Sequence, residues 1–263
     1  MKAETPAAIR AAIIITVFMV LLGIWFAVSA AGAVPPYILP PPGTAARAAV
    51  LNAPAMLPHL LMTLKTVGIG YIIALACAAA TALLMHRFRL LREILYPLLV
   101  VSQTVPLIVL APLLILWFGF GILPKVLMVV LVCFFPIAVN LLAGMDAVDP
   151  DILLLFRSLN AGYMKTFFHA RLPGSLPQLF AGLKIAGTYS IIGAVIGEWL
   201  GGTEGLGVYM VRAQKAFALE KVFAAIIYIV ALSLVILGIL SLLQKFFLPW
   251  AKKETYKPTG RSL

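Results

Sequence analysis

Apolar residues along this chain gather into six stretches that are separated by polar connections. Each stretch has about the twenty residues that a helix needs to cross roughly 30 Å of hydrocarbon. The fifth is the least apolar, because Lys184 and Glu198 leave only residues 185–197 uncharged. The pattern predicts an all-α, polytopic membrane protein with six transmembrane helices. These helices are expected at residues 11–31, 60–84, 94–118, 125–145, 180–200 and 222–247.

Composition and charge support the same class. Hydrophobic residues make up 63% of the chain and charged residues 11%, with a mean hydropathy of +1.09, which excludes an ordinary soluble domain. If the N-terminus lies inside, five of the 20 Lys and Arg residues face outward, two lie within apolar segments and the other thirteen face inward. Both termini are therefore expected in the cytoplasm, and the net charge of +11 reflects topology rather than nucleic-acid binding. The outer five are Arg47, Lys125, Arg212, Lys215 and Lys221.

Three parts follow from this pattern. Residues 1–56 hold the first apolar segment and a Pro-rich external linker, 34–43, which is expected to be extended and polyproline-like. Residues 57–248 form a five-segment core, and residues 249–263 form a cytoplasmic tail. Pro106, Pro112 and Pro136 interrupt helical hydrogen bonds within the core segments.

The connection at residues 145–178 is longer than two spanning helices need, which indicates a docking surface. Asp149-Pro150-Asp151 is a helix-start signal, with a capping side chain, a proline in the first turn and an acid near the positive helix end. Asn160 and Gly162 tolerate left-handed backbone and predict a turn. A second short helix is expected to run to about Arg171 and to stop before Pro173.

This connection resembles the cytoplasmic coupling loop of ATP-binding-cassette (ABC) importer permeases. The family pattern is Glu-Ala-Ala, three residues, Gly, nine residues, Ile, one residue and Leu-Pro. Leu172-Pro173 match, Ala170 takes the Ile position and Asn160 takes the Gly position. The acidic start is missing, because the three leading positions fall on Leu154, Leu155 and Phe156.

Further matches occur in order along residues 57–245. They resemble the nitrate-, sulfonate- and taurine-type permeases of this family. Within that family, the sequence at residues 102–106 and 117–121 favours the branch that handles pyrimidine precursors of thiamine. A nitrate-, sulfonate- or taurine-like anion is the alternative substrate class. The matching stretches are residues 59–65, 103–106, 111–121, 134–140, and 196–200 with 205–207.

The resemblance implies a type I ABC importer permease fold in the bacterial inner or plasma membrane, surrounded by lipid. It implies a non-enzymatic subunit without cofactor, a permease homodimer, two copies of a cassette ATPase, an extracytoplasmic binding protein, and alternating access driven by ATP. The residues expected to couple the ATPase are Leu154, Leu155, Phe156, Arg157, Leu159, Asn160, Gly162, Leu172 and Pro173.

Three polar residues within apolar segments are candidates for the translocation pathway. Glu198 either lines the path or the outer gate, paired with Lys184 or a basic residue of the external loop, or is solvated at the membrane surface. Gln103 and Asn140 either contact substrate or form hydrogen bonds between helices.

Other patterns carry less chemistry. Cys77 and Cys133 are expected to be small buried apolar groups, and neither a metal site nor a phosphate-binding loop is evident. Gly193 and Gly197 form a small-xxx-small pair that suits either a dimer seam or packing within the chain. The rival classes are a secondary transporter, which would have inverted repeats, and an intramembrane enzyme, which would need a catalytic set.

Overall fold

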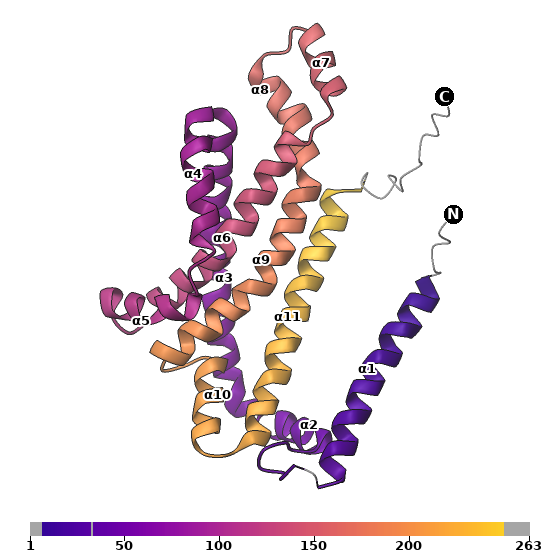
Figure 1. Ribbon diagram of the computed structural model, residues 1–263, viewed down its shortest axis with the longest axis vertical. Coiled ribbons are helices and arrows are strands. Elements are labelled where there is room, and N and C mark those ends of the chain that lie inside the picture. The colour runs from indigo at the N-terminus through magenta and orange to yellow at the C-terminus, as the bar shows by residue number, and fades with distance from the viewer. Residues whose placement is uncertain (1–6, 33, 250–263) are drawn as a thin grey trace.

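The computed structural model describes residues 7–32 and 34–249 (Figure 1). All of the regular secondary structure in this part of the chain is helical. Eleven α-helices and one π-helical turn, η1, follow one another there. Their bounds are α1 Ala7–Ala30, α2 Pro42–Leu51, α3 Ala53–Arg87, α4 Arg89–Ser102, α5 Leu107–Phe118, α6 Ile122–Asp146, α7 Pro150–Ser158, α8 Tyr163–Thr166, η1 Phe167–Arg171, α9 Leu172–Gly201, α10 Leu206–Lys215 and α11 Leu219–Phe247.

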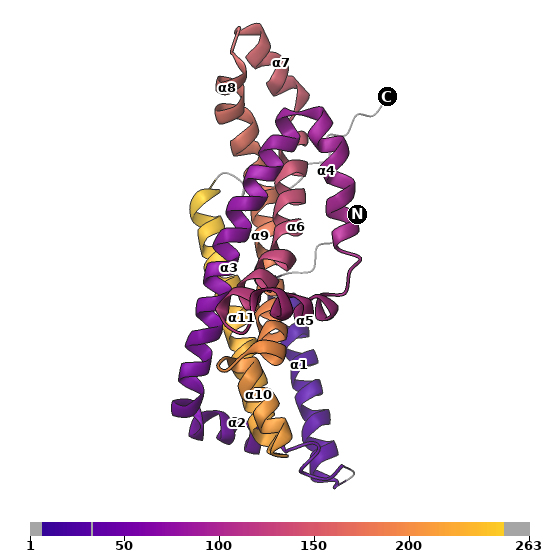
Figure 2. The ribbon, with the colours of Figure 1, turned by 90° about the vertical axis from the view of Figure 1, so that its left-hand side faces the viewer.

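Four helical stretches are long and apolar enough to cross a membrane: Ala53–Arg87, Ile122–Asp146, Tyr163–Gly201 and Leu219–Phe247. The third predicted segment, 94–118, is different. It consists of α4 and α5, which are bent by 101° at the break between them, so α5 lies across the long axis of the molecule (Figure 2). Counted as one span, the bent pair gives a fifth crossing, and α1 contributes a shorter apolar helix, Ile15–Ala30.

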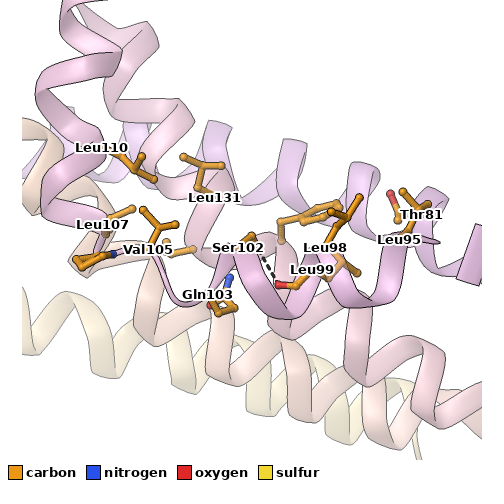
Figure 3. Close-up of a pocket in the computed structure, with 13 residues that line it drawn as sticks. Thr81, Leu95, Leu98, Leu99, Ser102, Gln103, Val105, Leu107, Leu110 and Leu131 are labelled. Atoms are coloured by element: carbon orange, nitrogen blue, oxygen red, sulfur yellow. Dashed lines mark hydrogen bonds between the residues drawn. The ribbon is translucent and has the colours of Figure 1, made fainter. Parts of the chain in front are cut away.

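The sequence predicted a spanning segment over residues 94–118 that is interrupted at Pro106, and the structure breaks the helix there, by a larger angle than a kink. The Pro106 ring disfavours helical backbone at the preceding residue, and this proline has no N–H to donate. Before the break the chain forms a tight turn, in which Thr104 N donates to Val101 O at 3.0 Å. A new helix, α5, begins after Pro106 (Figure 3).

The centre of the fold is α6, which packs against α3 on one side and α9 on the other. Small residues make these contacts close. A Cβ added to Gly70 of α3 would lie 2.6 Å from Val129 Cβ, and one added to Gly182 of α9 would lie 2.6 Å from Pro136 O. Gly193 likewise lies against Met128 and Gly197 against Lys125, so this glycine pair serves packing within the chain rather than a dimer seam.

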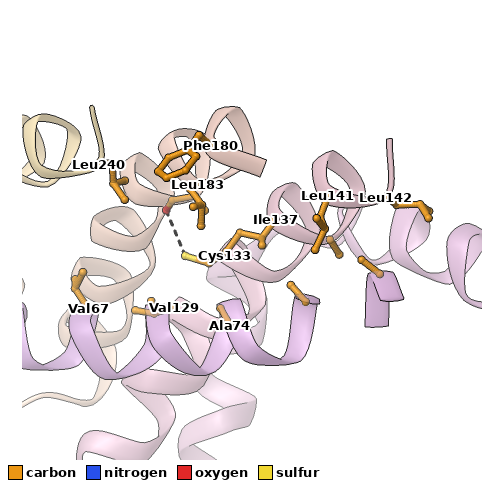
Figure 4. Close-up of a cluster of buried hydrophobic side chains, with 14 of the residues drawn as sticks. Val67, Ala74, Val129, Cys133, Ile137, Leu141, Leu142, Phe180, Leu183 and Leu240 are labelled. Atoms are coloured by element: carbon orange, nitrogen blue, oxygen red, sulfur yellow. Dashed lines mark hydrogen bonds between the residues drawn. The ribbon is translucent and has the colours of Figure 1, made fainter. Parts of the chain in front are cut away.

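A cluster of buried apolar side chains fills the space between these helices (Figure 4). Cys133 belongs to it, and its thiol donates to Ala186 O at 3.3 Å, which links α6 to α9. Cys77 is exposed on α3, so the expectation that both cysteines are buried was wrong for this residue. Other members of the cluster are Val67, Ala74, Val129, Ile137, Leu141, Leu183 and Leu240.

The first helix stands beside α11 near one end of the bundle (Figure 1). Trp25 of α1 stacks on Phe223 of α11 at 5.3 Å and its Nε1 donates to Pro40 O at 3.1 Å. The sequence predicted an extended linker at residues 34–43, between α1 and α2, but in the structure this linker forms a turn. Ile38 N and Leu39 N both donate to Pro35 O, because Pro36, the second residue of the turn, presets the backbone angle that brings these amides back to that carbonyl.

Candidate functional site

The elements that carry the candidate residues lie at three levels along the molecule (Figure 1). The α7–α8 loop projects from one end, the α4–α5 break lies at mid-height, and α10 packs at the other end. Each level holds some of the residues that the sequence singled out, so these residues do not form a single site.

The start of α7 is built as the sequence predicts. Asp149 Oδ1 accepts a hydrogen bond from Asp151 N at 2.8 Å, which satisfies one of the free amides of the first turn. Pro150 opens the helix, where its missing N–H costs nothing. Asp151 in the first turn and Arg157 in the last complement the helix dipole.

The end of α7 is a Schellman motif, centred on Asn160. Asn160 has φ +52°, in the left-handed region, as expected. Asn160 N donates to Arg157 O at 3.0 Å and Ala161 N donates to Phe156 O at 2.9 Å, which closes the last turn. Gly162 has φ −63°, so the left-handed turn depends on Asn160 alone.

The surface of α7 is apolar and open. The helix has no buried residue, and Leu159, at its C-terminal end, is 69% exposed. Residues three and four apart share a helix face, so Ile152, Leu155, Phe156 and Leu159 form one stripe, and Leu154 lies off it. Exposed leucines on an ordered helix mark an interaction surface.

The second helix of the loop does not end before Pro173, as the sequence suggested. Residues 163–201 form one continuous helical stretch, Tyr163–Gly201, through η1. Within η1 the backbone widens, so that Leu172 N donates to Phe167 O, five residues earlier. A wider turn makes room for the Pro173 ring, which would otherwise clash with the carbonyl four residues before it.

A hollow of about 660 Å³ lies at the α4–α5 break (Figure 3). Gln103 lies in its wall, and the structure gives its side-chain amide no hydrogen-bond partner among the described residues. Side chains of α3, α4, α5 and α6 complete the wall, and none of the lining residues is charged. The lining consists of Thr81, Leu95, Leu98, Leu99, Ser102, Gln103, Val105, Pro106, Leu107, Leu110, Leu131, Val132 and Phe134.

The other two pathway candidates lie outside this hollow. Asn140 is half-buried, and its Nδ2 donates to Pro136 O at 2.7 Å, so it bonds within its own helix rather than between helices. A Cβ on Gly182 would lie 2.7 Å from Asn140 Cβ, which places Asn140 in the α6–α9 contact.

Glu198 is enclosed by protein at the opposite end of the molecule from α7. Its side chain is 1% exposed, so the solvated-surface interpretation was wrong. Oε1 accepts from the Thr63 hydroxyl and Oε2 accepts from Gly207 N, both at 2.8 Å. The predicted partner Lys184 instead donates to Gln244 Oε1.

Groups from α3, α6 and the α9–α10 turn complete the surroundings of Glu198. Lys125 is buried beside this carboxylate, and its Nζ donates to Glu204 O at 3.0 Å. His59 Nδ1 accepts from Gly205 N at 3.0 Å, and Thr63 Oγ1 accepts from Leu206 N at 2.9 Å. The result is a buried polar cluster that fixes the turn into α10.

Sequence reasoning missed His59, Thr63 and Lys125. One signal was present: the predicted topology brings the start of the fourth segment and the end of the fifth to the same side, so Lys125 could have been matched with Glu198. A buried carboxylate needs a cation or several donors. The backbone N–H groups of residues 205–207 donate the other hydrogen bonds of this cluster, and no side chain in the sequence marks them as donors.

Comparison with known proteins identifies the family. The profile described as "Binding-protein-dependent transport system inner membrane component" matches residues 68–249. The chain is 36% identical over 240 residues to the formylaminopyrimidine transport permease protein ThiX of Halalkalibacterium halodurans, covering 91% of this chain and 96% of that protein. It is 30% identical to the riboflavin transport system permease protein RibX of Chloroflexus aurantiacus (88% and 87% covered) and 27% identical to the taurine transport system permease protein TauC of Escherichia coli (95% and 94% covered).

Solved structures agree on the fold. A crystal structure of an amino acid ABC transporter with histidines matches with a TM-score of 0.62 at 21% identity, covering 75% of this chain and 96% of that one. The inward-facing MetNI methionine ABC transporter matches with a TM-score of 0.57 at 16% identity, covering 73% and 94%. The chain belongs to the family of binding-protein-dependent transport system inner membrane components, the permease subunits of ABC importers.

Proposed function

We propose that α7 is the coupling helix of this permease and that its apolar stripe docks into a cleft on a cassette ATPase. The apolar stripe with exposed Leu155 and Leu159 on a capped helix that projects from the bundle carries the proposal, because contiguous exposed apolar side chains mark an interaction surface. Arg157, next to the stripe, would sit at the rim of the cleft. Co-purification of a cassette ATPase with the detergent-solubilised permease tests this contact.

Two copies of the chain would place two α7 helices on two ATPase subunits around a two-fold axis. In this scheme six helices cross the membrane, counting α1 and the bent α4–α5 pair, and both termini lie in the cytoplasm. ATP binding would bring the ATPases together and turn the pathway outward, toward an extracytoplasmic binding protein. Labelling of a cysteine at position 158 from outside intact cells, on a background free of Cys77 and Cys133, would contradict this topology.

The hollow at the α4–α5 break is proposed to form part of the translocation pathway. Irregular backbone at membrane depth is tolerated where it lines a cavity, and the break at residues 103–106 is such a stretch. The free amide of Gln103 is the polar group there that could bond a passing solute. Asn140 and Glu198 would support the pathway from outside the hollow, by fixing α6 and the turn into α10.

The proposed solute is a neutral pyrimidine precursor of thiamine rather than a taurine- or sulfonate-like anion. An anion in an apolar site needs a compensating cation, and the lining holds none. The 36% identical relative named for formylaminopyrimidine supports the same choice. Cells that depend on this system should take up labelled formylaminopyrimidine, and excess taurine should not compete. Competition by taurine, or no uptake of the pyrimidine, would overturn the substrate assignment.

A further inference from the structure

Both ends of the projecting loop meet at one histidine. Asp146 is the last residue of α6, where the chain leaves the bundle, and Arg171 is the last residue of η1, where it returns. His86, in the last turn of α3, lies between them. Its Nδ1 is 3.5 Å from Asp146 Oδ1, and its Nε2 is 2.8 Å from Arg171 Nη1.

The chemistry of these neighbours fixes the state of the ring. A guanidinium can only donate hydrogen bonds, so Nε2 of His86 must accept and carries no proton. The ring proton then lies on Nδ1, which faces the Asp146 carboxylate. The His86 side chain is only 7% exposed, so one neutral imidazole joins the two ends of the loop in a sheltered place.

A second contact extends this group to α4. Arg92 Nη2 lies 2.9 Å from Asp146 Oδ2, so the two oxygens of one carboxylate are shared between His86 and Arg92. Arg87, adjacent to His86 in the chain, lies with its guanidinium 5.0 Å from the centre of the Tyr163 ring, at the start of α8. The hairpin of α3 and α4 therefore holds the loop at several points.

The same α4 helix forms a wall of the hollow. Leu95, Leu98 and Leu99 line it, and α4 ends at the break that carries Gln103. The chain thus joins α7 to the ends of its loop, Asp146 at one end contacts Arg92 of α4, and α4 lines the hollow. A helix joined at one end by an ion pair passes a displacement to its other end.

We propose that His86, Arg92, Asp146 and Arg171 form a transmission cluster, through which a displacement of α7 moves α4 and with it the wall of the hollow. This inference rests on the proposed coupling role of α7. The four side chains are positioning residues, since they are proposed to touch neither the ATPase nor the solute.

The test is the ratio of ATP hydrolysed to solute transported, measured in vesicles with the ATPase and binding protein present. His86→Leu and Arg92→Gln should raise that ratio at least about fivefold, the size of effect that residues between two coupled sites produce. His86→Gln should restore most of the coupling, because its amide can accept from Arg171 and donate to Asp146. Arg89→Gln is the matched control, since it removes an exposed guanidinium of the same helix that pairs with Glu93.

A second measurement reports the movement itself. Spin labels at positions 101 on α4 and 131 on α6 should change separation when ATP is added to the wild-type complex, because a moving α4 changes its distance from α6, and this change should be lost in Arg92→Gln. Ratios and ATP-induced distance changes that stay as in the wild type in both cluster variants would overturn the inference. A ratio that rises equally in Arg89→Gln would also overturn it. A wild-type complex whose hydrolysis ignores the binding protein would instead defeat the proposed function.

Discussion

At Gly205 a missing side chain makes room for a carboxylate. Its φ of +132° is unfavourable for other residues, and a Cβ built there would overlap the carboxylate of Glu198. The neighbouring amides can then reach Thr63 and Glu198 directly. At the scale of single residues, therefore, the turn into α10 is fixed by the absence of one side chain and the burial of another.

Replacement of Gly205 tests this arrangement. Gly205→Ala should displace Glu198 and lower the stability of the folded permease by about 1–3 kcal/mol, the usual cost of overpacking a buried position. Gly68→Ala is the control, because a Cβ at that helical glycine meets open space. Thermal unfolding in detergent compares the two. Equal midpoints would show that the turn into α10 adapts without loss.

At the scale of elements, some prolines lie at a helix break and others stay within a helix. Pro106 ends α4, Pro136 stays within α6, and Pro173 is absorbed by the wide turn η1. The sequence chemistry of all three is similar. Pro97 and Pro112 also stay within α4 and α5, although these two helices lie at the edge of the bundle, so neither proline chemistry nor edge position alone places the break between them.

The end of α7 gives a prediction at the same scale. Asn160→Gly should be tolerated, because glycine enters the left-handed region freely. Asn160→Val should open the last turn of α7, since a β-branched residue at φ +52° is strained by roughly 1–2 kcal/mol. Limited proteolysis of the loop should show faster cleavage in Asn160→Val than in Asn160→Gly. Identical cleavage rates would mean that the turn does not depend on residue 160.

The Asp149 cap, the left-handed Asn160 and four of the six predicted spans depend on neighbouring residues, and the structure confirms them. Local signals also failed, since the Pro-rich linker between α1 and α2 is turned and the helix continues past Pro173. The partners of Glu198 and the cluster around His86 join segments far apart in the chain. Such contacts depend on how the helices are placed against one another, which periodicity and turn chemistry do not encode.

At the scale of the whole molecule, α7 projects at one end and α10 lies toward the other, with the α4–α5 break between them in height (Figures 1 and 2). This arrangement suits a permease that receives energy at one end and solute at the other. The buried core of α3, α6 and α9 spans that distance, while the bent α4–α5 pair at its edge is the element with room to move.

The most direct test of the account is ATP hydrolysis by the reconstituted complex of permease, ATPase and loaded binding protein. Leu159→Asp should abolish the stimulation of hydrolysis, because losing an apolar side chain at an interface centre costs on the order of 2 kcal/mol, about thirtyfold in affinity. Ser158→Asp, which adds the same charge to the same turn without removing a leucine, should keep the stimulation. Full stimulation in Leu159→Asp would show that α7 is only a connector and would contradict the account.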